Sequence, residues 1–327
     1  MPLTHTVRFI PHQRSISVAE DVSVLAAAQL GGMPLPHSCR SGRCGSCRAR
    51  LLSGRVEYPD GPPPGLSPQE TGEGFVLLCQ ALARSDLVVE ARLIQSQASA
   101  EIKTLPSRIV RREPLSPDVM RLILRLPSVE PLEFQAGQYL DVLLEGGRRR
   151  SYSVANAPNT GSELELHVRR IPGGAFTAGL FDSLRDGALL KIEGPLGQFR
   201  YEDGAEPVIF VAGGTGFAPL KAMLGQALRT DTRRELHLYW GARDAAGLYE
   251  EALVRDWAAR DSRLKVHTQC TGWVHETVLR DHPDLTPFAI YAAGPPALVA
   301  AIRRTFPAQG ARAPLLYLES FDYAVDP

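Results

Sequence analysis

The pattern of apolar and polar residues divides the 327-residue chain into three segments, each predicting a different kind of sheet. In residues 1–93, "HTVRFI" and "RSISVAE" alternate apolar and polar positions, which is typical of two half-buried strands joined as a hairpin. "DVSVLAAAQLGG" predicts a helix that begins at Asp21 or Ser23 and ends at a glycine pair. "RARLLSG" and "LVVEARL" predict further strands, so we expect a small β-rich domain here.

A polar stretch, "QSQASAEIKTLPS", follows and predicts a linker. Residues 103–203 then contain short apolar segments separated by proline and glycine, which predicts an antiparallel barrel or sandwich. The predicted strands are "SRIVRREPL", "VMRLILRLP", "QYLDVLL", "SYSVAN", "LELHVRR" and "LLKIEGPLG".

The pattern changes again over residues 206–327. "PVIFVA" is a continuous apolar run, which is typical of a strand buried on both faces of a parallel sheet. Strands such as "ELHLYWGAR" and "RLKVHTQC" alternate with helices such as "LKAMLGQAL" and "YEEALVRDWAAR", and "FAIYAAGPP" and "PLLYLESF" complete the set. The alternation predicts a doubly wound parallel sheet that binds its ligand at the carboxyl ends of the strands.

Charge and hydropathy exclude several classes of protein. The chain has 36 Lys and Arg against 36 Asp and Glu, so no net field attracts it to nucleic acid or to an anionic membrane. No apolar run approaches the length of a membrane span, and "MPLTHTVRF" lacks the apolar region of a signal peptide. We expect a cytoplasmic monomer, in a reducing compartment where structural disulfides are rare.

Four of the five cysteines follow the spacing of a plant-type 2Fe–2S centre. Cys39, Cys44 and Cys47 form a C-x4-C-x2-C run, and Cys79 in "VLLCQ" supplies a fourth thiolate from a distance. Small residues in the run would let backbone amides approach the cluster sulfurs. These residues are Ser41, Gly42, Gly45 and Ser46.

Other interpretations of these cysteines remain open. A zinc site usually pairs two C-x2-C knuckles, and only Cys44 and Cys47 form one here. Plain buried thiols are a further alternative, whereas a Rieske centre is excluded because no C-x-H pair exists. Cys270, in "VHTQCTGW", is predicted to be a buried structural thiol.

The second segment carries two motifs that suit an anionic ligand. "RRRSYSVAN" ends a basic run at Arg150, and "HVRRIPGGAFTAGLF" places a glycine pair before a short helix. Exposed amides at a helix N-terminus beside glycines form an anion site. A charged loop and an ordinary glycine turn are the alternatives for each motif alone.

In the third segment, a glycine loop and a later turn stand where a dinucleotide would bind. The loop is Gly214-x-Gly216-x-x-Pro219, with proline where the Rossmann fingerprint has its third glycine. Proline suits the first position of a helix. The later turn is "YAAGPPALV".

These motifs resemble known families in each segment. Residues 1–93 resemble a plant-type ferredoxin of the β-grasp fold. Residues 103–203, with R-x-Y-S and a glycine-rich loop, resemble the FAD-binding barrel of the ferredoxin–NADP reductase superfamily. Residues 206–327 resemble its nucleotide domain, with G-G-T-G-x-A-P and a C-G-P-P loop in which Ala293 replaces the cysteine. The order resembles NAD(P)H-dependent reductase components of bacterial multicomponent oxygenases and reductases of the CDP-4-dehydro-6-deoxyglucose reductase type.

The resemblance implies a 2Fe–2S cluster, FAD and NADH or NADPH as cofactors. It implies that Arg150 pairs with the FAD pyrophosphate, Tyr152 packs on the isoalloxazine, and Ser153 and Glu319 are catalytic beside the reacting atoms. The other flavin-binding residues that it implies are His167, Gly173, Gly174, Ala175, Phe176 and Thr177. The nucleotide-binding residues are Gly213, Gly214, Thr215, Gly216, Arg243, Asp244, Gly294, Pro295 and Phe321.

Three of these positions have competing interpretations. Asp244 is a candidate partner of the ribose and Arg243 of a 2′-phosphate, and we expect NADH to be preferred over NADPH. Phe321 either covers the flavin face where nicotinamide lands, with Tyr323 the next candidate for that role, or packs into the core.

The resemblance implies an electron chain from NAD(P)H through FAD and the cluster to a partner protein. The partner is an oxygenase or hydroxylase or, alternatively, a nucleotide-sugar deoxygenation enzyme. A redox sensor or scaffold without sustained turnover is a third hypothesis, of a different class. Arg40, Arg43 and Arg48 either form a docking surface for an acidic partner or offset the charge of the cluster.

Overall fold

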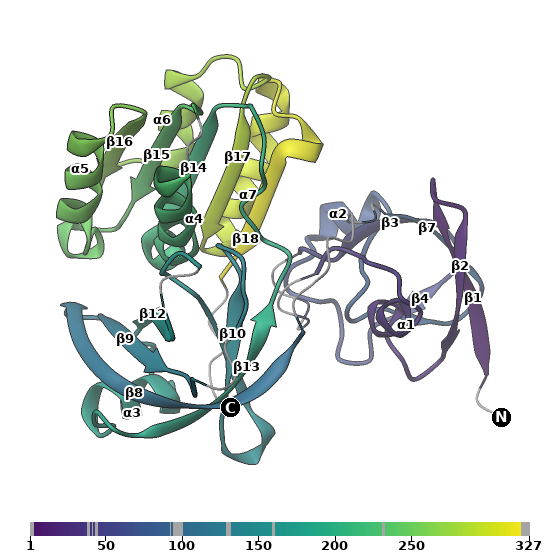
Figure 1. Ribbon diagram of the computed structural model, residues 1–327. Helices are drawn as coiled ribbons and strands as arrows, with labels where there is room; N and C mark the ends of the chain where they lie inside the picture. Colours follow the sequence, from purple (N-terminus) through teal and green to yellow (C-terminus); the bar gives the residue numbers. More distant parts are fainter. Residues whose placement is uncertain are drawn as a thin grey trace. The chain divides into compact units, whose positions relative to one another are not determined.

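In the computed structural model the chain forms two compact units, residues 1–99 and 100–327 (Figure 1). The residues that the structure describes are 3–37, 40, 42, 45–91, 93, 101–128, 132–158, 161–230 and 233–321. Among the described helices, none combines the length and apolar character needed to cross a bilayer.

The first unit is a mixed sheet covered by one main helix. The strands follow the order β2-β1-β7-β3-β5, in which β1 and β7 are parallel and the other pairs antiparallel. A small pair, β4 and β6, lies outside this sheet. The elements are β1 (Thr4–Ile10), β2 (Arg14–Ala19), α1 (Val24–Leu30), β3 (Arg48–Ser53), β4 (Val56–Glu57), α2 (Pro68–Gly72), β5 (Phe75–Leu77), β6 (Leu82–Ala83) and β7 (Leu87–Glu90).

Helix α1 shows why this segment folds as the sequence predicts. Of the two candidate caps, Ser23 is the one used, and its Oγ accepts a hydrogen bond from the Ala26 N–H at 3.3 Å. The helix ends at Gly31, and Val24 and Leu25 turn into the core of the unit. The arrangement is the expected β-grasp fold of a plant-type ferredoxin.

The second unit begins with an antiparallel barrel. Its strands follow the order β11-β10-β13-β8-β9-β12, and a bridge between Val154 and Leu166 joins the two ends of the sheet. The barrel form of the prediction is therefore confirmed, rather than the sandwich. The elements are β8 (Lys103–Ser116), β9 (Val119–Arg125), β10 (Tyr139–Leu143), the short helix η1 (Glu145–Gly147), β11 (Arg149–Ser153), β12 (Glu163–Arg169), α3 (Ala175–Asp182) and β13 (Leu189–Leu196).

The predicted linker is wrong in its second half, because residues 103–107 belong to β8. Leu105 and Ser107 are buried, and their backbones pair with β13. The Ser107 hydroxyl donates to the carbonyl oxygen of Leu190 at 3.0 Å, so a polar residue in this strand is satisfied inside the barrel. Residues 94–100, in the first half of the stretch, lie outside the described residues.

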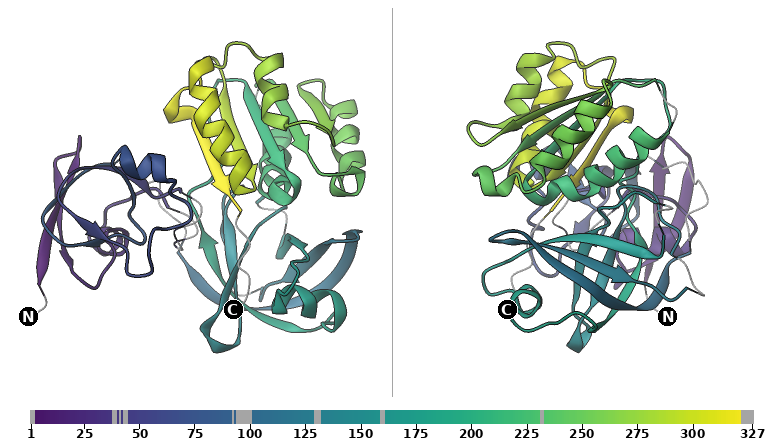
Figure 2. Two further views of the ribbon diagram at one scale, coloured as in Figure 1. Left: turned by 180° about the vertical axis from the view of Figure 1, so that it is seen from behind. Right: turned by 60° about the vertical axis from the view of Figure 1, so that its left-hand side comes forward.

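A doubly wound parallel sheet completes the second unit. The strand order is β16-β15-β14-β17-β18, and all four pairings are parallel. Helices α4 and α5 cover one face and α6 and α7 the other (Figures 1 and 2). The elements are β14 (Val208–Gly213), η2 (Gly214–Gly216), α4 (Phe217–Arg229), β15 (Leu236–Gly241), η3 (Ala245–Gly247), α5 (Glu251–Arg260), β16 (Leu264–Gln269), α6 (Val274–Asp281), β17 (Ala289–Gly294), α7 (Pro296–Thr305), η4 (Phe306–Gln309), η5 (Ala313–Leu315) and β18 (Leu316–Ser320).

Strand β14 is apolar throughout because both of its faces are covered. Val208 and Phe210 belong to the core under α4, and Ile209 and Val211 belong to the core under α6 and α7. All four are fully buried, as a central strand of a parallel sheet requires.

The five strands end together at one edge, which we call the carboxyl edge. Gly213 at the end of β14 lies opposite Gly241 of β15, and Gly241 lies opposite Gln269 of β16. On the other side, Gly294 of β17 lies opposite Ser320 of β18. The loops that follow these strands are therefore neighbours in the order of the strands, although they are far apart in the sequence.

Candidate functional site

The first unit brings two of the four predicted cluster ligands to neighbouring strand ends. The Leu78 N–H donates to the carbonyl oxygen of Cys47 at 3.2 Å, and Cys79 follows directly. Both thiols are buried. Cys39 and Cys44 lie outside the described residues, so the complete set of four ligands remains a prediction.

The environment of these thiols disfavours additional negative charge. Tyr58 accepts a hydrogen bond from the Leu77 N–H at 3.0 Å. Burial, together with the nearby Cys47 and Cys79 thiols, raises the pKa of Tyr58 to about 12, although the bond from Leu77 opposes the shift. Tyr58 therefore stays neutral beside the thiols at physiological pH.

Three of the described residues before Cys47 have turn-forming backbones. Arg40 (φ +54°), Gly42 (φ +72°) and Gly45 (φ +71°) have left-handed backbones. The Gln80 side chain, next to Cys79, donates through Nε2 to the carbonyl oxygen of Arg40 at 2.8 Å. The left-handed backbones of these described residues, the bond from the residue after Cys79 and the buried thiols of Cys47 and Cys79 fit a 2Fe–2S cluster.

Only part of the predicted arginine docking surface can be placed. Arg48 is paired with Glu70 and lies over the Phe75 ring at 4.2 Å. Arg40 is exposed, whereas Arg43 lies outside the described residues. Arg48 therefore contributes to the stability of the unit, and the docking role of Arg40, Arg43 and Arg48 remains a prediction.

In the second unit, β11 carries the three residues of the R-x-Y-S motif. Arg150 and Tyr152 are half-buried, and Ser153 at the end of the strand is buried opposite Tyr139. The Tyr152 ring lies 5.8 Å from the Phe176 ring of α3, measured between centroids. The motif and the glycine loop before α3, which the sequence connects only by resemblance, therefore adjoin each other.

The glycine loop is shaped by Thr177. Its hydroxyl accepts a hydrogen bond from the Ile171 N–H at 3.1 Å and donates to the carbonyl oxygen of Gly174 at 3.0 Å. A Cβ atom at Gly174 would lie 2.8 Å from that hydroxyl, and Gly173 has φ +75°. The N-cap residue of α3, Gly174, makes no side-chain capping hydrogen bond, which fits a helix start that binds a pyrophosphate.

The two predicted nucleotide loops touch at the carboxyl edge. A Cβ atom at Gly216 would lie 2.0 Å from the carbonyl oxygen of Ala293, and one at Gly213 would lie 2.8 Å from Pro295 Cδ. Gly214 has φ +54°. Glycine is therefore required at these positions so that the loop after β14 can pack against the end of β17.

Three aromatic residues that the sequence analysis missed support this loop. The Trp240 indole donates through Nε1 to the carbonyl oxygen of Gly214 at 3.0 Å. Phe217 stacks on Trp240 with ring centroids 4.0 Å apart, and the Tyr249 ring meets Trp240 edge-on at 5.2 Å. One feature of the sequence could have identified Trp240: it lies in "LYWGAR", at the end of the strand next to the central one.

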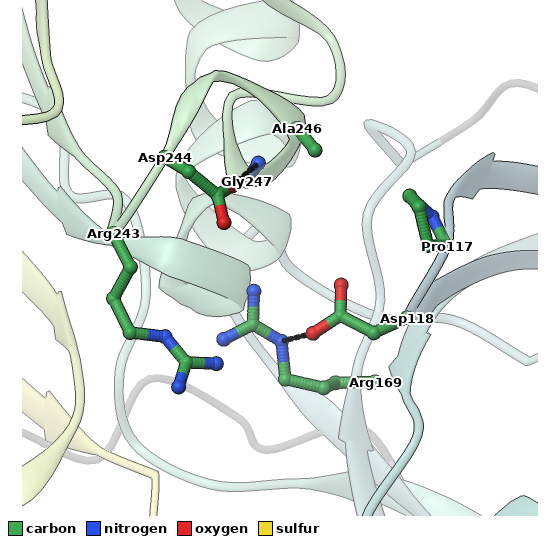
Figure 3. A pocket seen from close by; sticks show the side chains of 7 residues that line it. All are labelled: Pro117, Asp118, Arg169, Arg243, Asp244, Ala246 and Gly247. Carbon is green, nitrogen blue, oxygen red and sulfur yellow. Dashed lines mark hydrogen bonds and ion pairs between the residues drawn. The ribbon is translucent and has the colours of Figure 1, made fainter.

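A pocket of about 130 Å³ adjoins the loop, and Figure 3 shows its side chains. Arg169, at the end of β12, pairs through Nε with Asp118 Oδ2 at 3.3 Å, and its guanidinium lies beside Gly214. Arg243 points into the same pocket (Figure 3), while Asp244 Oδ1 accepts a hydrogen bond from the Gly247 N–H at 2.9 Å. The sequence predicted Arg243 and Asp244 but not Arg169 and Asp118.

The end of β18 lies at the same edge. Glu319 is buried and lies opposite Ala293 of β17. The Phe321 N–H donates to the carbonyl oxygen of Gly294 at 2.8 Å, and its side chain is half-buried. The role of Phe321 as a lid remains a prediction, and Tyr323 lies outside the described residues.

His167 belongs to a buried charge cluster, formed by Arg121, Glu165, His167, Lys221 and Glu250, between the barrel and the parallel sheet. Its Nε2–H donates to Glu165 Oε1 at 2.8 Å, and its Nδ1 accepts from the Tyr249 hydroxyl at 3.0 Å. Burial lowers the pKa of His167, so the ring is neutral. Both ring nitrogens are used here, and flavin binding by His167 remains a prediction.

The acidic groups of the cluster have metal-like spacing but are already neutralised. One ligand atom each from Glu165, His167 and Glu250 lies within 4.8 Å of the others. However, Lys221 Nζ lies 2.6 Å from Glu165 Oε1 and 3.1 Å from Glu250 Oε1, and Arg121 pairs with both carboxylates. Burial tends to raise the pKa of Glu165, but the hydrogen bond from His167 and the charge of Lys221 outweigh it and lower the pKa. Lys221 and Arg121 thus already provide positive charge to both carboxylates, and Arg121 is shared with a third, Glu113.

Family models match each segment of the chain. The model "2Fe-2S iron-sulfur cluster binding domain" matches residues 8–84, "Oxidoreductase FAD-binding domain" residues 106–201, and "Oxidoreductase NAD-binding domain" residues 210–304. Each match lies inside the segment in which the sequence predicts that domain.

Similar proteins align with this chain over most of their length. The CDP-6-deoxy-L-threo-D-glycero-4-hexulose-3-dehydrase reductase of Yersinia pestis is 35% identical over 294 residues, covering 87% of this chain and 88% of the relative. Reductase component 2 of terephthalate 1,2-dioxygenase from Comamonas sp. is 33% identical over 313 residues, covering 92% of each. The solved structure of an Amycolatopsis cytochrome P450 reductase has a TM-score of 0.75 and 32% identity, with 97% of this chain and 99% of that one covered.

Proposed function

Because the chain belongs to the NAD(P)H-dependent iron–sulfur flavoprotein reductases, we propose that the residues at the carboxyl edge and on β11 are its reaction site. NAD(P)H carries two electrons as a hydride, whereas a 2Fe–2S cluster takes one electron at a time, and the chemistry that FAD supplies is the conversion between the two. The electrons then leave the chain for a partner protein. The observation that carries the assignment is the packing of the Gly216 loop against Ala293, directly beside Glu319.

The proposed roles follow from the chemistry of each residue. The planar guanidinium of Arg150 pairs with pyrophosphate oxygens, and the first amides of α3 contact the same anion. Tyr152 supplies a flat apolar ring against the flavin. Ser153 donates a hydrogen bond near the reacting atoms, and Glu319 holds a carboxylate at the edge where nicotinamide enters.

Replacing Ser153 by Ala is expected to slow flavin reduction about tenfold, since one hydrogen bond made in the transition state contributes roughly 1 to 1.5 kcal/mol. FAD binding should change little. Stopped-flow reduction by NADH measures the rate, and fluorescence titration measures FAD affinity. Ser151→Ala is the matched control, because Ser151 lies on the same strand but donates to Asp141 Oδ1 at 2.6 Å. An unchanged rate in Ser153→Ala would remove this residue from the site.

We also propose that NADH is preferred over NADPH. In the pocket of Figure 3, Asp118 and Asp244 balance Arg169 and Arg243, so no net positive charge favours a dianionic 2′-phosphate. A carboxylate such as Asp244 suits the ribose hydroxyls instead. The proposed preference for NADH therefore depends on the balance of charges in this pocket. Arg243 is the residue whose positive charge would favour NADPH instead.

Arg243→Ala is therefore expected to leave kcat/KM for NADH within about threefold of the wild-type value and to lower any residual NADPH activity, since a lost exposed charge contact contributes roughly 0.2 to 1 kcal/mol. Steady-state kinetics with both donors and ferricyanide as acceptor measure this. If the wild-type enzyme prefers NADPH strongly and Arg243→Ala abolishes that preference, the proposal is wrong.

The physiological acceptor is proposed to be an oxygenase or hydroxylase component in the cytoplasm, where thiols remain reduced, with the reductase acting as a monomer. A nucleotide-sugar dehydrase is the second candidate, favoured by the 35% identity to the Yersinia pestis reductase. NADH-dependent turnover by purified oxygenase and dehydrase proteins encoded beside the gene, each with this chain as the only reductase, distinguishes the two. Sustained reduction of cytochrome c by NADH would also argue against a sensor or scaffold.

A further inference from the structure

A lysine in α4 is buried one helical turn after the glycine loop. Lys221 is the fifth residue of the helix, which begins at Phe217 directly after Gly216, and it is only 8% exposed. Lysine is almost never buried unless its charge is paired, because moving an isolated charge out of water is costly. The burial of Lys221 therefore depends on the acidic groups around it.

The acidic partners of Lys221 come from two other elements of the second unit. Its Nζ donates to Glu165 Oε1 at 2.6 Å and to Glu250 Oε1 at 3.1 Å. Glu165 belongs to β12 of the barrel, whereas Glu250 directly precedes α5 of the parallel-sheet part. Arg121 of β9 pairs with the same two carboxylates. Lys221 thus connects the helix that follows the glycine loop to the barrel through a short, directional contact.

Strand β12 adjoins both halves of the proposed reaction site. At its end, the Arg169 guanidinium lies beside Gly214 of the glycine loop. Nearer its start, Leu166 forms a bridge with Val154, the residue directly after the R-x-Y-S motif. Glu165 directly precedes Leu166. The contact between the lysine and Glu165 therefore fixes α4 against the part of the barrel that lies beside the motif.

The geometry of this contact bears on the reaction because hydride transfer is sensitive to distance. A misplacement of about 1 Å that originates far from the chemistry can slow a reaction about 100-fold. Apolar packing alone would permit such a shift, since cores accept changes of shape at similar volume and lose rigidity before they lose stability. An ammonium held at hydrogen-bond distance between two buried carboxylates permits much less movement.

We propose that Lys221 is a positioning residue for hydride transfer, which holds α4 and its glycine loop at the separation from β12 that brings nicotinamide onto the flavin. The inference rests on the proposed function, since that function places FAD against β11 and the dinucleotide at the glycine loop. In the reaction, a hydride leaves a C–H bond of NADH with both electrons and bonds to the flavin, which yields NAD⁺ and two-electron-reduced FAD. Lys221 acts on the rate of this step through the loop, without contacting the reacting atoms.

Lys221→Met removes the charge from a side chain of similar length. With excess FAD, stopped-flow reduction at saturating NADH should slow about tenfold or more per bound flavin, whereas the NADH concentration that gives half the limiting rate should change by less than about threefold. NADH deuterated at the transferred position should react more slowly still, because hydride transfer limits the rate in the variant. Glu165→Gln should slow the same step. The double variant should be no slower than the slower single one, because both residues form one contact.

Lys265→Met is the matched control, since the same substitution removes an exposed lysine (54%) that pairs with Glu235 at the opposite end of the sheet. Its limiting rate should equal the wild-type value. Lys221→Gln, which keeps a hydrogen-bond donor for one carboxylate, replaces the methionine variant if that variant does not retain FAD, and should likewise slow the limiting rate.

Two results would overturn the proposal. If the reduction rate per bound flavin stays at the wild-type value while the melting temperature falls, Lys221 only stabilises the unit. If the limiting rate is unchanged and the half-saturating NADH concentration rises, Lys221 acts on nucleotide binding and not on hydride transfer. Failure of the wild-type chain to reduce its bound FAD with NADH would count instead against the proposed function.

Discussion

Cys79→Ser is expected to abolish electron delivery to cytochrome c while NADH-dependent reduction of ferricyanide continues. Cys79 is buried directly after the Leu78–Cys47 hydrogen bond and is one of the four predicted cluster ligands. Serine is a poor ligand for the cluster compared with a thiolate, so iron and the visible absorbance of the cluster should be lost. The flavin and nucleotide parts form a separate compact unit with cores of their own, and should keep their activity.

Iron content, absorbance and the two acceptor assays together measure this result. Cys270→Ser is the matched control, because Cys270 packs against the nucleotide core and is not among the predicted ligands. A full complement of iron in Cys79→Ser, or zinc in place of iron in the wild-type protein, would refute the ligand assignment.

Glu250→Gln is expected to destabilise the second unit by about 3 kcal/mol, since breaking a buried ion pair leaves an uncompensated charge. The Glu250 side chain is only 4% exposed and pairs with Arg121 and Lys221. Without its charge, Lys221 would keep Glu165 as its carboxylate partner and Arg121 would keep Glu165 and Glu113. For a unit of this size the melting temperature should fall by roughly 6 to 12 °C.

Differential scanning calorimetry with excess FAD measures the loss, and the neighbouring residue supplies the control. Glu251 pairs with Arg255 one helical turn away, at the surface, where such a pair contributes about 0.3 to 0.5 kcal/mol. Glu251→Gln should therefore lower the melting temperature by no more than about 2 °C. Equal effects of the two substitutions would show that the buried charge cluster does not hold the barrel and the parallel sheet together.

Local sequence patterns were sufficient to predict the architecture of the chain. The run "PVIFVA" predicts a strand buried on both faces, and β14 divides its side chains between two cores as expected. The alternation in "HTVRFI" and the cap at Ser23 are likewise local signals. The linker prediction was wrong over residues 103–107. The polar Ser107 is typical of loop sequence, and its partner in the barrel, the carbonyl oxygen of Leu190, cannot be identified from the sequence.

The parts of the site that could not be predicted from the sequence depend on contacts between residues that are far apart along the chain. Trp240 supports the Gly214 loop, and Arg169 reaches the same loop from the barrel. Nothing in the sequence near Arg169 shows that a strand of the barrel ends beside a loop 45 positions later. The buried charge cluster has the same origin, because Arg121 and Glu250 are charged residues that sequence patterns assign to surfaces.

The central claim is that this chain passes electrons from NADH through FAD to a 2Fe–2S cluster. Anaerobic reduction by NADH, followed by electron paramagnetic resonance at low temperature, tests it most directly. We predict bleaching of the flavin absorbance together with the signal of one reduced 2Fe–2S cluster per chain, and loss of that signal alone in Cys79→Ser. A flavin that bleaches fully while no cluster signal develops in the wild-type protein would contradict the account.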